Sequence, residues 1–268
     1  MRVIICPSAE EASRQAANMV AKQLQKKANS VLGLATGDTP KKLYKQLIEK
    51  YRENKIDFSE VTTFNLDEYF GLRPEHPQSY RSFMQEYFFS QINIPSSQTF
   101  VPNGLTSDVE NYGAKYEAQI DSAGGIDLQI LGIGRDGHIG FNEPGSSLGS
   151  LTRVKALTSE TISDNARFFN TKEQVPHLAI TMGVGSILKA KTCLLLAFGS
   201  AKSKAVMEMI EGPITSQVTA SALQLHPQTV VFLDEEAAEK LARKKYYHEA
   251  EAAQKQLEIF SSDNTPLP

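Results

Sequence analysis

The sequence predicts an α/β fold: one domain with a mostly parallel sheet and helices on both faces. Short, continuously apolar segments alternate along the chain with segments of helical periodicity. Continuous apolar runs are typical of strands that are buried on both faces of a parallel sheet. The 268 residues show no visible linker or internal repeat. Residues 1–260 are therefore predicted to form one domain, and residues 261–268 a frayed tail.

Six apolar segments are predicted as strands. They are Arg2–Cys6, Ser30–Ala35, Val61–Leu66, Ile126–Gly134, Thr192–Gly199 and Thr229–Asp234. Helices are predicted between them, since apolar residues recur there every three or four positions. The helices begin at Ser8 and near Pro40, span Ser79–Phe89, Val109–Ile120 and Ser200–Gly212, and begin again near Glu235. Pro40 suits the first turn of its helix.

Polar motifs follow four of the predicted strands. In chain order they read "TGDTP", "DEY", "GRDGH" and "GSAKS". Ligands of open α/β sheets bind beyond the carboxyl ends of the strands. Because the carboxyl ends of parallel strands meet at one edge, the four motifs predict a single site there.

The segment 131–145, "LGIGRDGHIGFNEPG", resembles a nucleotide-binding turn at first. Gly132, Gly134 and Gly137 match G-x-G-x-x-G directly after a predicted strand. A dinucleotide site also needs a helix that begins at the third glycine. Here "HIGFNEPGSS" follows, without helical periodicity. The pattern is therefore weak evidence for a nucleotide.

The same loop carries three side chains that can exchange protons: Asp136, His138 and Glu143. A metal site is one interpretation, but no C-x-x-C or H-E-x-x-H pattern supplies a defined ligand set. Acid–base chemistry is favoured, because histidine titrates near neutral pH and neighbouring carboxylates can orient it. A second carboxylate pair, Asp67 and Glu68, ends another strand at the same edge.

A phosphate site is predicted where "GLATGDTP" leads from a strand into a helix, because backbone N–H groups at a helix N-terminus bind anions. The candidate phosphate-binding residues are Thr36, Gly37, Asp38 and Thr39, with Arg167 and Lys202 as basic partners. A plain strand-to-helix turn and solvated surface charges remain the alternatives.

Composition excludes several classes of protein. A net charge of −3 argues against a nucleic-acid partner, which favours a basic face. No apolar run approaches the roughly 20 residues of a membrane span. Cys6 and Cys193 both lie in predicted strands, which indicates buried free thiols and a reducing, cytoplasmic setting.

Taken together, the motifs resemble the glucosamine-6-phosphate deaminase family. The resemblance is carried by "TFNLDEYFGL", "HPQSYRSFM", "GIGRDGHIGFNEPGSSL", "RFF", "GVGSIL" and "SALQLHP" and extends to about Tyr247. It implies a single Rossmann-like domain. It also implies a reaction without a cofactor or metal, in which an amino-sugar phosphate, glucosamine 6-phosphate, is opened, isomerised and deaminated to fructose 6-phosphate and ammonium.

The resemblance also implies roles for individual residues. Asp67 matches the base that moves a proton between C2 and C1, and His138 matches the residue that assists ring opening. Asp136 and Glu143 match the carboxylates that hold this histidine. Phosphate binding falls to "TGDT", Arg167 and Lys202. Asp38 departs from the family pattern, which has glycine or serine there, and unless it points outward it should repel a phosphate.

The motifs leave two alternatives for regulation and assembly. Many family members are hexamers activated by N-acetylglucosamine 6-phosphate, whereas others are unregulated monomers. Ser146, Arg153, Lys155 and Tyr246 match the effector site, but Leu151, Ala156 and Thr192 depart from it. A galactosamine-6-phosphate deaminase, a 6-phosphogluconolactonase and a non-catalytic sugar-phosphate sensor are the alternative functions.

Overall fold

The computed structural model describes residues 1–169 and 174–263. Its main feature is a seven-stranded sheet in the order β1-β10-β9-β6-β2-β3-β5, in which all the paired strands run parallel. The strands are β1 (Arg2–Cys6), β2 (Val31–Leu34), β3 (Thr62–Asn65), β5 (Thr99–Phe100), β6 (Leu128–Leu131), β9 (Thr192–Ala197) and β10 (Thr229–Asp234). The predicted α/β fold with a mostly parallel sheet is confirmed.

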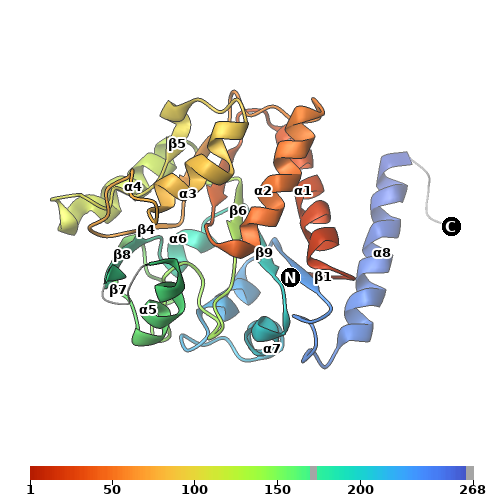
Figure 1. The fold of residues 1–268 in the computed structure, drawn as a ribbon. Coiled ribbons are helices and arrows are strands. Elements are labelled where there is room, and N and C mark those ends of the chain that lie inside the picture. Colours follow the sequence, from red (N-terminus) through yellow and green to blue (C-terminus); the bar gives the residue numbers. More distant parts are fainter. Residues whose placement is uncertain (170–173, 264–268) are drawn as a thin grey trace.

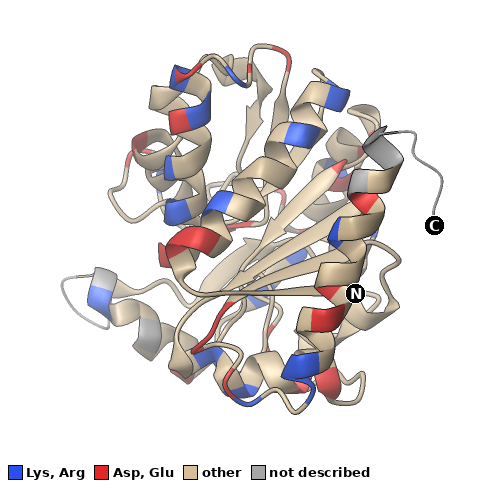
Figure 2. Ribbon diagram, turned by 90° about the vertical axis from the view of Figure 1, so that its right-hand side faces the viewer, with Lys and Arg blue, Asp and Glu red and all other residues tan. Residues whose placement is uncertain are grey.

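The helices cover both faces of this sheet (Figure 1). They are α1 (Ala9–Lys26), α2 (Asp38–Arg52), α3 (Tyr80–Tyr87), α4 (Val109–Ser122), α5 (Ser159–Asn165), α6 (Val184–Leu188), α7 (Ser203–Glu211) and α8 (Lys244–Asp263). Short 3₁₀ segments include η1 (Phe89–Gln91), η2 (Ser96–Gln98), η3 (Ala166–Phe168), η5 (Ser200–Lys202) and η6 (Thr219–Leu225). Basic and acidic residues are interspersed over the helices (Figure 2).

The order of the strands creates a crevice between β2 and β6. The chain runs through β1, β2, β3 and β5 toward one edge, and then returns through β6, β9 and β10 toward the other. Since crossovers between parallel strands are right-handed, this reversal moves the connecting helices to the opposite face. The connections that leave the neighbouring strands β2 and β6 therefore diverge, and ligands of open α/β sheets bind at such a point.

A second, three-stranded antiparallel sheet was not predicted. It consists of β4 (Asp67–Tyr69), β8 (Leu178–Thr181) and β7 (Arg153–Ala156). The predicted strand Val61–Leu66 and the "DEY" motif thus belong to different sheets. Leu66 joins them: its N–H donates to Leu34 O at 2.9 Å, and its carbonyl accepts from Met182 N at 2.7 Å. Each strand has only three or four residues, too short for a periodicity signal.

The charged helix that was predicted to begin near Glu235 begins at Lys244 instead. Asp234 ends β10, and its carboxylate accepts from Gly199 N and Ala237 N, which forms a turn. Glu211 then accepts from Ala242 N and Arg243 N and holds the chain just before α8. Side-chain acceptors of this kind compete with helical bonding. Helix α8 extends to Asp263, and residues 264–268 of the predicted tail lie outside the described residues.

Both cysteines are free and buried, as expected. Burial raises the pKa of the Cys6 thiol to about 11 and that of Cys193 to about 12. None of the helices within residues 1–169 and 174–263 has the length and apolar character of a membrane span.

Buried Glu117 ties three elements together. This residue of α4 accepts from Thr152 N at 3.1 Å and Thr152 Oγ1 at 2.5 Å beside β7, from the Ser186 hydroxyl of α6, and from Lys189 Nζ at 3.2 Å. Burial raises the pKa of the Glu117 carboxyl, but these hydrogen bonds outweigh burial and hold the pKa below its usual range.

We therefore expect Glu117→Ala to lower the free energy of unfolding by about 2–4 kcal/mol, because buried donors on Thr152 and Ser186 would lose their acceptor. Lys189→Ala is the matched control. Its side chain is half exposed, so its loss should cost less than about 1 kcal/mol. Urea unfolding of the three proteins measures both values, and equal destabilisation by the two variants would contradict the expectation.

Candidate active site

A pocket of about 670 Å³ opens at the carboxyl ends of β2, β3 and β6. The residues that line it come from the start of α2, from β4, from α3, from the loop after β6, and from α5, η3 and η5. The four polar motifs predicted to share one sheet edge meet in this pocket. Eight of the ten predicted catalytic and phosphate-binding residues line it: Thr36, Gly37, Asp38, Thr39, Asp67, His138, Arg167 and Lys202.

The other two, Asp136 and Glu143, lie next to the Nδ1 atom of His138 and do not line the pocket. His138 Nδ1 lies 2.7 Å from Asp136 Oδ1 and 3.8 Å from Glu143 Oε2. Glu143 is almost fully buried, with a side-chain exposure of 2%, and its Oε2 has no hydrogen-bond partner among the described residues. Burial raises the pKa of the Asp136 carboxyl, but the hydrogen bond and charge of His138 outweigh burial and hold the pKa below its usual range. Asp136 therefore stays ionised beside the imidazole.

Glycine allows this loop to fold so tightly. A Cβ at Gly134 would lie 2.4 Å from the ring of His138 and 2.7 Å from Asp136 Oδ1. Gly140 has a φ of +56°, and a Cβ there would lie 2.9 Å from Thr181 Oγ1 and 3.5 Å from Asp67 Oδ2. No helix follows the third glycine of the G-x-G-x-x-G pattern, so the loop lacks the helix N-terminus that holds a pyrophosphate. The glycines bring the histidine loop close to Asp67.

The trio also has the donor atoms for a metal ion: one oxygen of Asp136, one nitrogen of His138 and one oxygen of Glu143 lie within 4.8 Å of one another. Two ligands of one tetrahedral zinc ion would stand about 3.3 Å apart. The 2.7 Å between His138 Nδ1 and Asp136 Oδ1 is shorter than that separation, so the two atoms as they stand are too close together to share such an ion. Nδ1 is the ring nitrogen that lies next to the two carboxylates, and His138 lines the pocket.

Asp67 and Glu68 are adjacent, yet only Asp67 lines the pocket. Glu68 accepts from the backbone N–H groups of Tyr69, Tyr80 and Arg81 at 2.8, 2.9 and 3.0 Å, and so anchors the start of α3. Asp67 is 6% exposed. Burial, with a smaller contribution from the negative charge of Glu68, raises the pKa of Asp67 to about 8.

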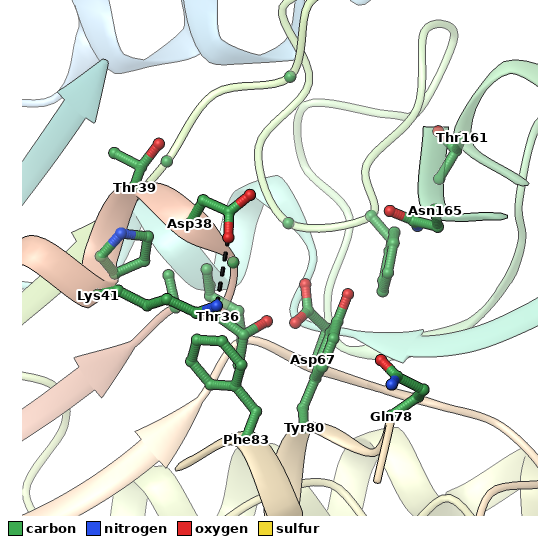
Figure 3. Close-up of a pocket in the computed structure, with 18 of the residues that line it drawn as sticks. Thr36, Asp38, Thr39, Lys41, Asp67, Gln78, Tyr80, Phe83, Thr161 and Asn165 are labelled. Atoms are coloured by element: carbon green, nitrogen blue, oxygen red, sulfur yellow. Dashed lines mark hydrogen bonds and ion pairs between the residues drawn. The ribbon is translucent and has the colours of Figure 1, made fainter. Parts of the chain in front are cut away.

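Aromatic rings surround Asp67, and the sequence did not single them out. Tyr80 packs on Tyr69 with ring centroids 5.0 Å apart and stacks on Phe141 at 6.0 Å, while Phe169 meets Tyr69 edge-on at 5.8 Å. All four line the pocket, and Figure 3 shows Tyr80 beside the Asp67 carboxylate. These four rings thus give the pocket an apolar wall beside a carboxylate.

The other end of the pocket begins at helix α2. Its N-cap is Gly37, which has no side chain to cap it, whereas the N-cap side chains of α1, α3, α4 and α5 all accept a backbone N–H. Asp38 Oδ1 lies 3.3 Å from Lys41 Nζ, and Asp38 Oδ2 lies 3.2 Å from Arg167 Nη2. The Lys41 ammonium also lies over the rings of Tyr87 and Phe83, 4.3 and 5.3 Å from their centroids. Lys41 was missed from the sequence, although its i,i+3 spacing from Asp38 was a signal.

Comparison with known proteins identifies the family. Residues 7–232 match the family model described as "Glucosamine-6-phosphate isomerases/6-phosphogluconolactonase". The chain belongs to this family. Its relatives include glucosamine-6-phosphate deaminases from Hahella chejuensis, 55% identical over 92% of this chain and 94% of the relative, and from Thermoanaerobacter pseudethanolicus, 55% identical over 89% and 94%.

Solved structures agree with this assignment. A structure described as a monomeric glucosamine-6-phosphate deaminase superposes with a TM-score of 0.87 at 45% identity, and covers 89% of this chain and 99% of its own. The 6-phosphogluconolactonase from Leishmania guyanensis superposes with a TM-score of 0.70 at 20% identity, over 90% and 98%. At that identity the second likeness shows a shared fold alone.

Within this deaminase-related chain, the four predicted effector residues are not all brought together. Arg153 and Lys155 lie on β7, and Arg153 Nη1 donates to Asn142 Oδ1 at 2.9 Å in the loop that leads to buried Ser146. Tyr246 is exposed on α8, on the opposite side of the molecule from β7 (Figure 1). A site that uses all four residues requires a second chain.

The raised pKa of Asp67 predicts a pH dependence of stability. Between about pH 4 and pH 8 the carboxyl is ionised in the unfolded chain but protonated in the folded one. The contribution of Asp67 to the free energy of unfolding is therefore largest below pH 4, and it is lost as the pH rises toward 8. The amide of the Asp67→Asn variant cannot ionise, so this variant should not lose stability in this pH range.

We expect the melting temperature of Asp67→Asn to exceed that of the wild type by a margin that grows several degrees from pH 5 to pH 8.5, since each kcal/mol corresponds to roughly 2–4 °C in a domain of this size. Differential scanning calorimetry across this range measures the margin. Asp121→Asn, at an exposed position of α4, is the control and should show a constant difference. A constant margin for Asp67→Asn as well would rule out a buried, protonated Asp67.

Proposed function

We propose that this protein is a glucosamine-6-phosphate deaminase, which converts glucosamine 6-phosphate and water to fructose 6-phosphate and ammonium without a cofactor. One observation carries the proposal. Asp67 and the histidine of an Asp136–His138–Glu143 cluster face the same pocket, whose far end has an uncapped helix N-terminus with cationic side chains. The relatives at 55% identity support the same activity.

In this proposal Asp67 is the base that moves the proton between C2 and C1 of the opened sugar. Proton abstraction next to a carbonyl or imine needs a carboxylate beside the carbon. A pKa of about 8 makes Asp67 a stronger base than an ordinary carboxylate. The substrate carries an ammonium group at C2, and a positive charge close to Asp67 favours its ionised form. Binding of the amino sugar would thus supply the base in its active state.

His138 serves the ring-opening step, in which a proton leaves the C1 hydroxyl and a proton arrives at the ring oxygen. Nδ1 faces Asp136 at 2.7 Å, so Nε2 performs the transfer. Asp136 and Glu143, 2.7 and 3.8 Å from Nδ1, hold the ring in place. His138 therefore works at the ring oxygen, and Asp67 at the carbon.

The phosphate is proposed to bind at the start of α2, among Thr36, Gly37 and Thr39, with Arg167 and Lys202 as cationic partners; Lys41 joins this set from the structure. An anchored phosphate orients the reacting end of the sugar. Asp38, which the sequence predicts among the phosphate-binding residues, presents a negative charge at the same place.

Three other functions remain to be separated by experiment. A galactosamine-6-phosphate deaminase differs by one inverted hydroxyl, and a 6-phosphogluconolactonase shares the fold. A non-catalytic sensor would bind the sugar phosphate without needing Asp67. Regulation by N-acetylglucosamine 6-phosphate and a hexameric state stay predictions, and a relative at 45% identity is described as monomeric.

The decisive experiment measures release of ammonium and fructose 6-phosphate from glucosamine 6-phosphate, with galactosamine 6-phosphate and a chelator in parallel. We expect equimolar release from the gluco sugar and the same rate after chelation, since His138 Nδ1 and Asp136 Oδ1 lie 2.7 Å apart, closer than two ligands of one tetrahedral zinc ion. Loss of activity on chelation would indicate a metal at Asp136, His138 and Glu143. Binding of either sugar without release would indicate a sensor.

Two variants separate the proposed roles. Asp67→Asn should abolish turnover and leave sugar-phosphate binding largely intact, because the amide cannot accept the C2 proton.

Lys202→Ala should mainly raise KM, by about tenfold for one lost charge-assisted contact. Lys204→Ala, which removes an exposed lysine two residues away on α7, is the control for Lys202. Steady-state kinetics decide: near-normal turnover by Asp67→Asn, or an unchanged KM for Lys202→Ala, would remove that residue from its role.

A further inference from the structure

Asp38 places a carboxylate inside the part of the pocket where the phosphate is proposed to bind. It is the first residue of α2, directly after the uncapped N-cap Gly37. Figure 3 shows its carboxylate turned into the pocket, on the side that faces Asp67, with Lys41 as a partner. Asp38 Oδ2 also contacts Arg167 Nη2 at 3.2 Å, across 129 positions of sequence. One acidic side chain thus engages two cations that a phosphate would use.

These ion pairs are accessible enough to exchange. The side chains of Asp38 and Arg167 are 57% and 67% exposed, and that of Lys41 is about one-third exposed. Exposed pairs of this kind are weak, because water screens them. An incoming phosphate dianion offers the same cations two charges and three acceptor oxygens, and can therefore replace a single carboxylate.

Replacement leaves the carboxylate beside the phosphate. Asp38 is fixed by its backbone to the first turn of α2, where the N–H groups of the helix also attract the anion. Its side chain can turn toward water but cannot leave the end of the pocket. The like charges then repel each other. This repulsion and the loss of the Asp38–Arg167 contact both oppose the binding of the phosphate.

Resting on the proposed function, we propose that Asp38 is an internal anion that competes with the substrate phosphate for Arg167 and Lys41, and so weakens the binding of sugar phosphates. It acts on affinity alone: the chemistry at Asp67 and His138 lies at the other end of the pocket. Asp38 is thus a determinant of substrate affinity, and the catalytic proton transfers do not involve it.

The first test is kinetic. Asp38→Asn keeps the size of the side chain and removes its charge, and Asp38→Ser removes the carboxyl group as well. Both should lower KM for glucosamine 6-phosphate about fivefold to tenfold, the effect of one charge near a dianion at high dielectric, with kcat within about twofold. Glu49→Gln, on the exposed surface of the same helix, removes one charge away from the pocket and should leave both constants unchanged.

The second test does not depend on turnover. Isothermal titration calorimetry with inorganic phosphate measures the anion site of the wild type, Asp38→Asn and Glu49→Gln directly. Tighter phosphate binding by Asp38→Asn alone is the expected result. Equal or weaker binding, or no binding by any of the three proteins, would overturn the inference, as would an unchanged or increased KM in both Asp38 variants. Failure of the wild type to release ammonium would refute the proposed function, while the phosphate titration would still decide the role of Asp38.

Discussion

The junction of two sheets at Leu66 determines where the Asp67 carboxylate lies. The N–H of Leu66 still pairs with Leu34 of the parallel sheet, whereas its carbonyl already pairs with Met182 after β8. The next residue, Asp67, is the first of an antiparallel strand and lies opposite Thr181. Because side chains alternate along a strand, this junction directs Asp67 into the pocket and Glu68 away from it, to the N-terminus of α3. Two adjacent carboxylates therefore have different surroundings, one in the pocket and one at a helix N-terminus.

Environment then separates the acid–base groups of the pocket. Asp67 lies among aromatic rings, where desolvation holds a proton on the free carboxyl up to about pH 8. His138 lies against two carboxylates, one of them partly exposed and kept ionised by the histidine itself. In the proposed mechanism, the apolar wall suits Asp67 as a base that ionises when a cationic substrate arrives, and the carboxylate-lined loop suits His138 as a proton carrier at an oxygen. The same fold thus supplies two groups with opposite electrostatic requirements.

Much of this arrangement was predictable because it depends on local patterns. Strands such as Arg2–Cys6 and Thr229–Asp234 are unbroken apolar runs, and their predicted bounds agree with the structure. The strands of the small sheet were not predictable, since Asp67 pairs with Thr181, 114 positions away, and β7 contains Arg153 and Lys155. Propensity carries no information about such pairing.

The site divides in the same way. Residues that carry chemistry in one loop, such as Asp136 and His138, were recognisable from their types and spacing. The aromatic wall around Asp67 was not, because Tyr80 and Phe141 resemble core residues until the fold places them beside a carboxylate. The prediction that a helix begins near Glu235 was wrong for a related reason. Asp234 and Glu211 accept hydrogen bonds from backbone N–H groups that a helix would otherwise use.

The phosphate end of the pocket shows how a fold can offer an anion site and limit its strength at once. The uncapped start of α2 and the cations around it attract negative charge whatever its source. A carboxylate in the first turn satisfies the same field, which is why acidic residues are common at helix N-termini. In the proposed site, Asp38 thus occupies the cations that would bind the substrate phosphate. Since uniformly tight binding of substrate and transition state does not raise kcat, a weaker phosphate anchor can leave the chemical steps proposed for Asp67 and His138 untouched.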